Sequence, residues 1–193
     1  MADTVLINAE AILRAIPPVH RSLQRLEGHI MDMHELADHV AIRNLIDRFS
    51  LGVTVRDRGA IASVFTEDAE WRVGQPPDIF LSGAGKIGEG IVTGLGNFEF
   101  LVQMVHSVVI DLAGERATAQ SVIQEVGRLV GGASGMQMLG IYHDELRRAD
   151  NGWRFARRFF EPICLDTAAP GGALVDAAVG RAGLQSARVE ASE

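Results

Sequence analysis

From residue 101 onward the chain alternates apolar and polar residues with a period of two, and short turns interrupt the alternation. The turns read LAGERA, GGASG and RADNG, and the Asn-Gly pair in the last is a strong hairpin signal. Successive side chains of a strand point to opposite faces of its sheet. The pattern therefore predicts an antiparallel meander of four long strands, over residues 101–112, 115–130, 135–148 and 152–164.

The preceding segment, residues 33–53, has the different spacing of an amphipathic helix. Asp32 before it and Glu35 three residues later form a capping-box pattern, which is typical of a helix N-terminus. Apolar residues recur along one side of this helix at Leu36, Val40, Ile42, Leu45, Ile46 and Phe49.

Four shorter elements are expected between this helix and the meander. A second helix is predicted over 57–65, two strands over 66–73 and 78–83, and a glycine-containing third helix over 84–98. Helices gathered early in the chain and strands gathered late indicate an α+β fold. A curved sheet around the helices would enclose a cone-shaped cavity, which is the natural place for a ligand.

Composition limits the classes of function. The net charge of −7 argues against nucleic-acid binding and against docking on anionic membranes. The lone Cys164 excludes an internal disulfide and a cysteine-based zinc cluster. The glycines around Lys86 lack the spacing of a phosphate-binding loop, so no nucleotide is expected. His34 and His39 are five residues apart rather than four, so no metal site is expected, and no other cofactor is predicted. Without a transmembrane run or a signal-peptide pattern, the expected location is the cytoplasm.

One domain is expected over residues 31–163. Residues 1–30 are predicted to form a helical extension outside it, in which a short helix over residues 5–16 ends before Pro17 and Pro18. Residues 164–193 are rich in Ala and Gly and are predicted to form a tail.

His106 lies in the otherwise apolar segment VQMVHSVVID, residues 102–111. With strict alternation, Met104, Val108 and Ile110 share its face of the strand. An imidazole on such a face is either a core residue with satisfied hydrogen bonds or a group held in a dry pocket for chemistry. The residues alone leave both interpretations open.

The order of the elements and five local phrases resemble the SnoaL-like family of the nuclear transport factor 2-like superfamily, in the layout of scytalone dehydratase and the bile acid dehydratase. The phrases are AIRNLIDRFS, RDRGAIASVFTEDAEW, SGAGKIGEGI, VHSVVIDLAGERATAQS and GIYHDELRRADNGWRFARR, within residues 34–162. The resemblance implies an α+β cone in which a curved antiparallel sheet wraps around about three helices.

The resemblance also implies a catalytic pair. A histidine on the strand after the third helix takes a proton from carbon, and an aspartate near the end of the first helix orients and charges it. His106 stands where the histidine is expected, but Thr54 occupies the place of the aspartate. Gln120 or Ser121 stands near the place of a second histidine. A buried histidine without a carboxylate ionises less readily, so it is expected to be a weaker base.

Further residues complete the expected site. Asp57 is expected to cap the second helix, and it can replace the missing carboxylate only if it points inward. Tyr142 either directs its hydroxyl into the cavity or packs with the hydroxyl at the surface. Asp144 and Arg158 lie on adjacent strands and are expected to form a structural pair. The expected substrate-binding residues are Thr54, Phe65, Trp71, Met104 and Ser121.

These features predict a cofactor-free lyase, dehydratase or isomerase that acts on a hydrophobic cyclic small molecule, with His106, Asp57 and Tyr142 as catalytic residues. The alternative is a non-catalytic protein that binds a hydrophobic ligand or serves as an assembly subunit, as the small subunits of ring-hydroxylating dioxygenases do. A homo-oligomer, either a trimer or a dimer, is expected through apolar positions on the outer sheet face such as Val105 and Val109.

Overall fold

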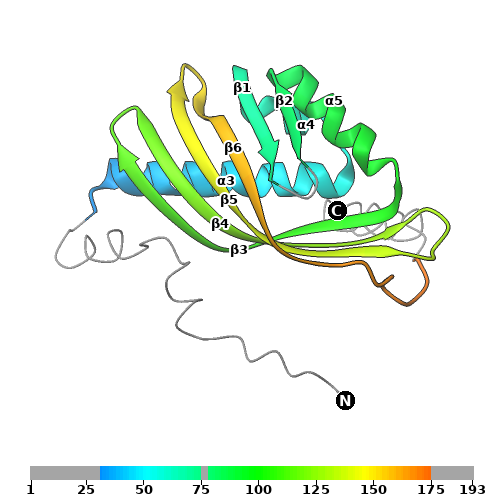
Figure 1. The fold of residues 1–193 in the computed structure, drawn as a ribbon. Coiled ribbons are helices and arrows are strands. Elements are labelled where there is room, and N and C mark those ends of the chain that lie inside the picture. The colour runs from blue at the N-terminus through cyan, green and yellow to red at the C-terminus, as the bar shows by residue number, and fades with distance from the viewer. Residues whose placement is uncertain (1–30, 75–77, 175–193) are drawn as a thin grey trace, which may run out of the picture.

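The computed structural model describes residues 31–74 and 78–174 of the chain. The predicted extension over 1–30 and most of the predicted tail, residues 175–193, lie outside the described residues. Within the described ranges the elements are α3 (Met33–Val55), α4 (Arg58–Ser63), β1 (Phe65–Val73), β2 (Ile79–Ser82), α5 (Ala84–Leu95), β3 (Phe98–Ala113), β4 (Arg116–Leu129), β5 (Gly135–Ala149) and β6 (Gly152–Asp166) (Figure 1).

The six strands form one sheet in the order β2-β1-β6-β5-β4-β3. The predicted meander is confirmed, because β3, β4, β5 and β6 pair antiparallel in chain order. The prediction of a wholly antiparallel sheet is wrong in one place: β1 runs parallel to β6. A parallel neighbour requires a long crossover connection, and here α5 and the meander provide it.

The long helix α3 begins with the predicted capping box. The Asp32 carboxylate accepts hydrogen bonds from the backbone N–H groups of His34 and Glu35 at 2.8 and 2.9 Å. The Glu35 carboxylate accepts from the Asp32 backbone N–H at 3.1 Å. These bonds satisfy N–H groups that have no partner within the helix, so they fix where α3 starts.

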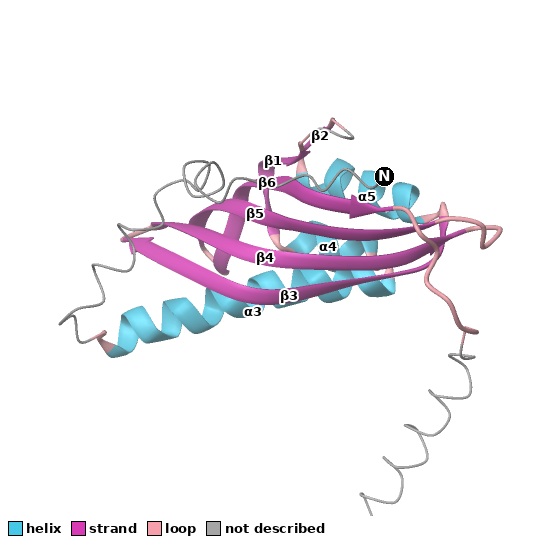
Figure 2. Cartoon of the chain, turned by 60° about the horizontal axis from the view of Figure 1, so that its bottom comes forward, coloured by secondary structure: helices cyan, strands magenta, loops and turns pink. Residues whose placement is uncertain are grey.

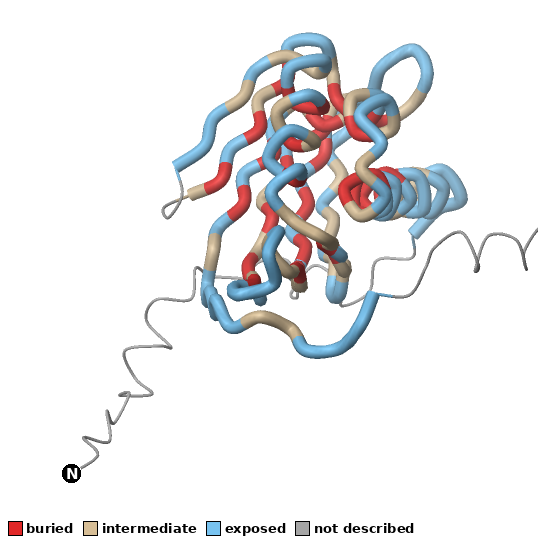
Figure 3. Tube along the Cα trace, turned by 90° about the vertical axis from the view of Figure 1, so that its right-hand side faces the viewer, coloured by how far each residue is buried: buried red, intermediate tan, exposed pale blue. Residues whose placement is uncertain are grey.

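The helices lie on the concave side of the sheet, and the buried residues gather between the two layers (Figures 2 and 3). Ile42, Ile46 and Phe49 from α3 are fully buried there, together with Ile61 of α4 and Ile87 of α5. The helices therefore close one side of a half-open cone, and the fold class expected from the sequence is confirmed. No helix in the described ranges has both the length and the apolar character needed to cross a membrane.

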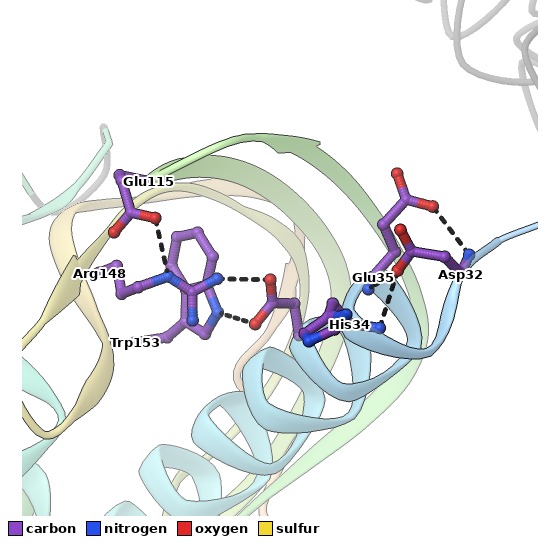
Figure 4. Close-up of polar contacts among 7 residues, drawn as sticks. Asp32, His34, Glu35, Glu115, Arg148 and Trp153 are labelled. Atoms are coloured by element: carbon purple, nitrogen blue, oxygen red, sulfur yellow. Dashed lines mark hydrogen bonds and ion pairs between the residues drawn. The ribbon is translucent and has the colours of Figure 1, made fainter.

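The first turns of α3 are attached to the β5–β6 hairpin through Asp38. Figure 4 shows Arg148, Trp153 and Glu115 beside the start of this helix. The Asp38 carboxylate accepts hydrogen bonds from the guanidinium of Arg148 and, at 3.0 Å, from the indole of Trp153. The Arg148 guanidinium also lies 4.6 Å from the Trp153 ring centroid and 3.3 Å from Glu115. The bond from Arg148 holds the pKa of the Asp38 carboxyl below its usual range.

Replacing Asp38 by alanine is expected to destabilise the protein by about 1–3 kcal/mol, because the Arg148 guanidinium and the Trp153 indole N–H both lose their acceptor. Urea unfolding measures the change. Asp47→Ala is the matched control on the same helix: Asp47 forms an exposed pair with Arg43, worth about 0.5 kcal/mol or less. Equal losses in the two variants would contradict the attachment through Asp38.

Candidate functional site

A cavity of about 390 Å³ lies inside the cone, between the ends of α3 and α5 and the inner face of the sheet. Its wall is mainly apolar and includes Phe49, Val53, Leu81, Ile91, Leu101, Met138 and Phe160. Four polar side chains also line it, from Asn97, Gln103, Glu125 and Tyr142, together with the indole of Trp71. A mostly apolar cavity with a few convergent polar groups is the usual form of a small-molecule site.

Gln103 and Glu125 form the most polar part of this wall. They face each other from β3 and β4, which pair at these residues, and the Gln103 Nε2 donates a hydrogen bond to the Glu125 Oε1 at 2.6 Å. Burial raises the pKa of the Glu125 carboxyl, and the bond from Gln103 opposes part of that rise. A carboxyl group in this setting is a stronger base than one in water, once it is ionised.

The backbone of Gln103 is held in place by the end of α3. Its N–H donates to the Thr54 Oγ1 at 3.0 Å, and its carbonyl accepts from the Ser50 Oγ at 2.8 Å. The side-chain Oε1 of Gln103 is buried and has no hydrogen-bond partner within the described ranges. Thr54 therefore positions the strand residue beside it, and that residue is Gln103 rather than a histidine.

Tyr142 brings a phenol to the same cavity from β5. Its oxygen accepts a hydrogen bond from the Trp71 Nε1 at 3.3 Å. Burial raises the pKa of this phenol, whereas the charge of Arg158 and the bond from Trp71 oppose the rise. The phenol therefore keeps its proton at neutral pH and is available as a hydrogen-bond donor.

Gly140 makes room for the aromatic rings beside Tyr142. A Cβ atom at this position would lie 2.3 Å from the Phe160 Cζ, so any side chain would displace that ring. The Phe160 and Tyr142 rings pack at 4.9 Å between centroids. Glycine is thus required here for the shape of the cavity wall.

Arg158 and Asp144 form a fully buried pair behind Tyr142, as the sequence predicted for these adjacent strands. Their side chains have no exposed surface, and the Arg158 Nε lies 3.3 Å from the Asp144 Oδ1. Burial raises the pKa of Asp144 to about 6, against the opposing charge of Arg158. The guanidinium lies over three rings, at 4.2 Å from Phe49, 3.9 Å from Tyr142 and 4.3 Å from Phe155.

The structure does not place His106 in the cavity. The register of β3 and β4 shifts between Val105 and Val108, which marks a β-bulge. Val105 and Val108 both pack against the core, whereas His106 is exposed and its Nε2 lies 3.3 Å from the Gln124 Oε1. An extra residue in a strand reverses the faces of the side chains beyond it, so strict alternation from Met104 to Ile110 was wrong.

The remaining expected residues are divided between the cavity and other places. Trp71 and Tyr142 line the cavity. Asp57 is the N-cap of α4 and accepts from the Ala60 N–H at 2.9 Å, so its carboxylate does not point inward. Phe65 lies in the core against Phe49. Thr54, Met104 and Ser121 do not line the cavity either. Ser121 is buried, and it pairs with Tyr142 of the neighbouring strand.

Glu125 and Gln103 are the cavity residues that the sequence analysis missed. A signal was present for Glu125: with Ser121 and Ile123 it lies at alternate positions of β4, on the buried face. A charged residue on the buried face of a strand is unusual unless it is paired or functional. Among the described residues, no group of three potential metal ligands occurs.

The sequence and the fold were compared with known proteins. The profile of the SnoaL-like domain family matches residues 34–159. The chain belongs to the SnoaL-like family. Hexachlorocyclohexane dehydrochlorinase 1 of Sphingobium indicum is 28% identical over 159 residues, which cover 75% of this chain and 97% of that protein. Gamma-hexachlorocyclohexane dehydrochlorinase of the same species is 28% identical over 147 residues, covering 68% and 88%. These distant relatives of the SnoaL-like chain are lyases.

Solved structures support the fold. A type 2 hexachlorocyclohexane dehydrochlorinase has a TM-score of 0.65 at 19% identity, over 74% of this chain and 96% of that one. The type 3 enzyme of Novosphingobium barchaimii has a TM-score of 0.64 at 20% identity, over 72% and 96%. A provisionally assigned scytalone dehydratase of Novosphingobium aromaticivorans reaches 0.62 at 21% identity, over 72% and 97%. The cone of this SnoaL-like domain is therefore also the fold of these solved proteins.

Gly94→Leu is expected to block large ligands without destabilising the fold. Gly94 lines the cavity, and a Cβ built on it meets no atom within 4 Å. Replacing a helical glycine should add roughly 0.5–1 kcal/mol of stability. Gly85→Leu is the matched control, because Gly85 lies on the same helix, is also unobstructed, and is outside the lining. Ligand titration should show weaker binding only for Gly94→Leu; unchanged binding would exclude this cavity as the ligand site.

Proposed function

We propose that this protein is a cofactor-free lyase or isomerase that removes a proton from a carbon of a hydrophobic, cyclic small molecule. The observation that carries the proposal is the Glu125 carboxyl at the wall of an apolar cavity, 2.6 Å from the Gln103 amide. Glu125 accepts the proton in this scheme, in place of the histidine that the family resemblance implied.

The chemistry is balanced without a cofactor. The C–H bond of the bound ligand breaks, and its proton moves to the Glu125 carboxylate. In a lyase the electron pair forms a new C=C bond and expels a leaving group from the neighbouring carbon. In an isomerase the pair is delocalised into the ligand, and Glu125 returns the proton to another carbon. The apolar wall keeps water from the carboxylate and so maintains its basicity.

Two features support the proposal. The distant relatives of this chain include dehydrochlorinases, which are lyases named for a hydrophobic cyclic compound. The cavity itself offers both an apolar wall and a carboxyl group whose pKa is raised by burial. Perturbed carboxyl groups in clefts are candidates for acid–base catalysis.

The test is a two-step screen with the full-length protein. Thermal shift identifies binders among polycyclic, terpenoid and chlorinated cyclic compounds. Each binder is then incubated with the protein in D₂O, and mass spectrometry measures deuterium uptake and any elimination product. Exchange or elimination by the wild type and by Gly85→Leu, but not by Gly94→Leu, supports the proposal.

The non-catalytic alternative gives a different result in the same screen. Ligands that bind the wild type tightly, without deuterium uptake or elimination at any pH from 5 to 9, would overturn the enzymatic proposal. That outcome would favour a protein that binds a hydrophobic ligand without changing it.

A further inference from the structure

Four side chains hold Tyr142 in the cavity wall. Its ring packs against Phe49 at 5.8 Å and Phe160 at 4.9 Å between centroids. Its oxygen accepts from the Trp71 indole, and its ring face lies 3.9 Å from the Arg158 guanidinium. Within the described residues, the phenol O–H donates to no acceptor. The O–H of this phenol is therefore an unused donor at the wall of the cavity.

Arg158 and Trp71 act on this phenol in the same direction. A cation over the ring face stabilises negative charge on the ring and its oxygen. An N–H bond to the same oxygen also stabilises negative charge, and it polarises the O–H group. Both contacts therefore make the Tyr142 O–H a stronger donor than the same buried phenol would be without them, while burial keeps its proton in place.

The structure gives Arg158 no direct route to a ligand. Its side chain is fully buried, it is outside the cavity lining, and the Tyr142 ring lies beside it. A fully buried arginine is costly unless it is paired, and its partner Asp144 lies on the adjacent strand. Of the residues that line the cavity, Phe49 and Tyr142 lie against the Arg158 guanidinium, and Tyr142 is the one of these two with a polar atom. The Arg158 charge therefore acts on a polar group of a ligand through the Tyr142 phenol.

We propose that Arg158 is a positioning residue that strengthens Tyr142 as a hydrogen-bond donor, and that the ligand is an apolar ring compound with a carbonyl oxygen that accepts from Tyr142. This inference rests on the proposed function both for the cavity and for Glu125 as the base. As Glu125 takes the proton from the carbon beside the carbonyl, the electron pair moves onto the carbonyl oxygen, and the Tyr142 O–H stabilises the enolate. Glu125 and Tyr142 lie at separate points of the sheet. Glu125 pairs with Met138 of β5, and Tyr142 follows Met138 by four residues, which is roughly 13 Å along the strand.

The first experiment measures the ligand class by binding alone. Tetralone and tetralin share a fused-ring skeleton, but only tetralone has a carbonyl oxygen. Calorimetry or ligand titration should give the wild type about tenfold tighter binding of tetralone, the effect of one good hydrogen bond. Tyr142→Phe should abolish the preference for tetralone, and Arg158→Met should reduce it several-fold. Arg158→Lys should keep more of the preference than Arg158→Met, because lysine keeps the positive charge. Equal affinities for the two compounds in the wild type would overturn the inference.

The second experiment detects the charge of Arg158 at the phenol. Tyr142 is the one tyrosine of the chain, so 2,3,5-trifluorotyrosine at this position gives a single ¹⁹F signal whose phenol titrates in an accessible range. Arg158→Met should raise the titration midpoint by about one pH unit. Asp144→Asn should lower it, because it removes a negative charge that raises the pKa of Tyr142.

A purely structural role would not produce shifts of opposite sign from the two partners. Arg128→Met is the matched control: Arg128 also lies over an aromatic ring, that of Phe100, but seven residues along β4 from Ser121, the pairing partner of Tyr142. The ¹⁹F midpoint should not move in this variant. If Asp144→Asn does not fold, the Arg158→Met and Arg158→Lys midpoints still decide, and identical midpoints in wild type and Arg158→Met would exclude the charge effect.

The two proposals fail in different ways. Loss of the tetralone preference with intact deuterium exchange elsewhere would remove Tyr142 and Arg158 from the mechanism but leave Glu125 as the base. A tetralone preference that depends on Tyr142, without any exchange, would remove the enzymatic function and leave a carbonyl-binding site.

Discussion

Glu125→Gln is expected to slow proton abstraction by about 10²- to 10⁴-fold, the usual contribution of a general base. The substitution keeps the shape of the side chain and its contact with Gln103, but an amide does not accept the proton from carbon. Ligand affinity is therefore expected to change by less than about threefold. Deuterium uptake by a bound substrate measures the rate, and titration of the same substrate measures the affinity.

The pH dependence of the rate gives a second readout for Glu125. Only the carboxylate accepts a proton, so the rate falls as the pH drops through the raised pKa of this group, above its ordinary 4.5. Gln103→Leu removes the donor that favours the carboxylate, so this acid limb moves to higher pH while the limiting rate at high pH is largely kept. His106→Ala is the control, because His106 is exposed outside the lining. Equal rates in the wild type and Glu125→Gln would exclude Glu125 as the base.

Phe49→Ala is expected to destabilise the protein by about 3–5 kcal/mol, a large part of the stability of a domain of this size. Phe49 is fully buried and contacts the rings of Phe65, Tyr142 and Phe155 edge-on, in addition to the Arg158 guanidinium. Its loss leaves a cavity and removes one of the three rings around a buried cation.

Urea unfolding measures this loss, and Leu51→Ala serves as the control on the same helix. Leu51 is 62% exposed, so its truncation should change the free energy of unfolding by about 0.5 kcal/mol or less. A loss below about 1 kcal/mol for Phe49→Ala would show that α3 is not attached to the sheet through this residue. Such a result would also remove the physical basis for the fixed position of the Tyr142 ring.

The two apolar residues on which the oligomer prediction was based, Val105 and Val109, lie in different environments in the structure. Val109 is 38% exposed, but Val105 packs against the core because it precedes the bulge. The outer face nevertheless exposes Val102, Val122, Leu139 and Phe159. The association state stays a prediction.

Much of the fold could be predicted from the sequence, because two local periods occur in it: the spacing of an amphipathic helix and the alternation of a strand. Apolar residues at helical spacing and the Asp32 and Glu35 pair predicted α3 and its start. Alternation with three turns predicted β3 to β6, and the structure confirms their antiparallel pairing. The parallel pairing of β1 with β6 could not be predicted in this way. It joins segments more than eighty residues apart, and no local pattern specifies which edge of a meander an earlier strand will meet.

The functional site depended on tertiary structure, and the segment VQMVHSVVID shows why. The sequence determined that this segment is a strand and that it carries a histidine. Gln103 faces the cavity beside Thr54, so His106, three residues further along the strand, faces outward. The extra residue between Val105 and Val108 then returns Val108 and Ile110 to the core side, and His106 does not share their face. A bulge depends on how two strands fit around the helices, so alternation within one strand does not reveal it. The sequence alone therefore determined the cone, and packing decided that a carboxyl, an amide and a phenol, rather than a histidine, line it.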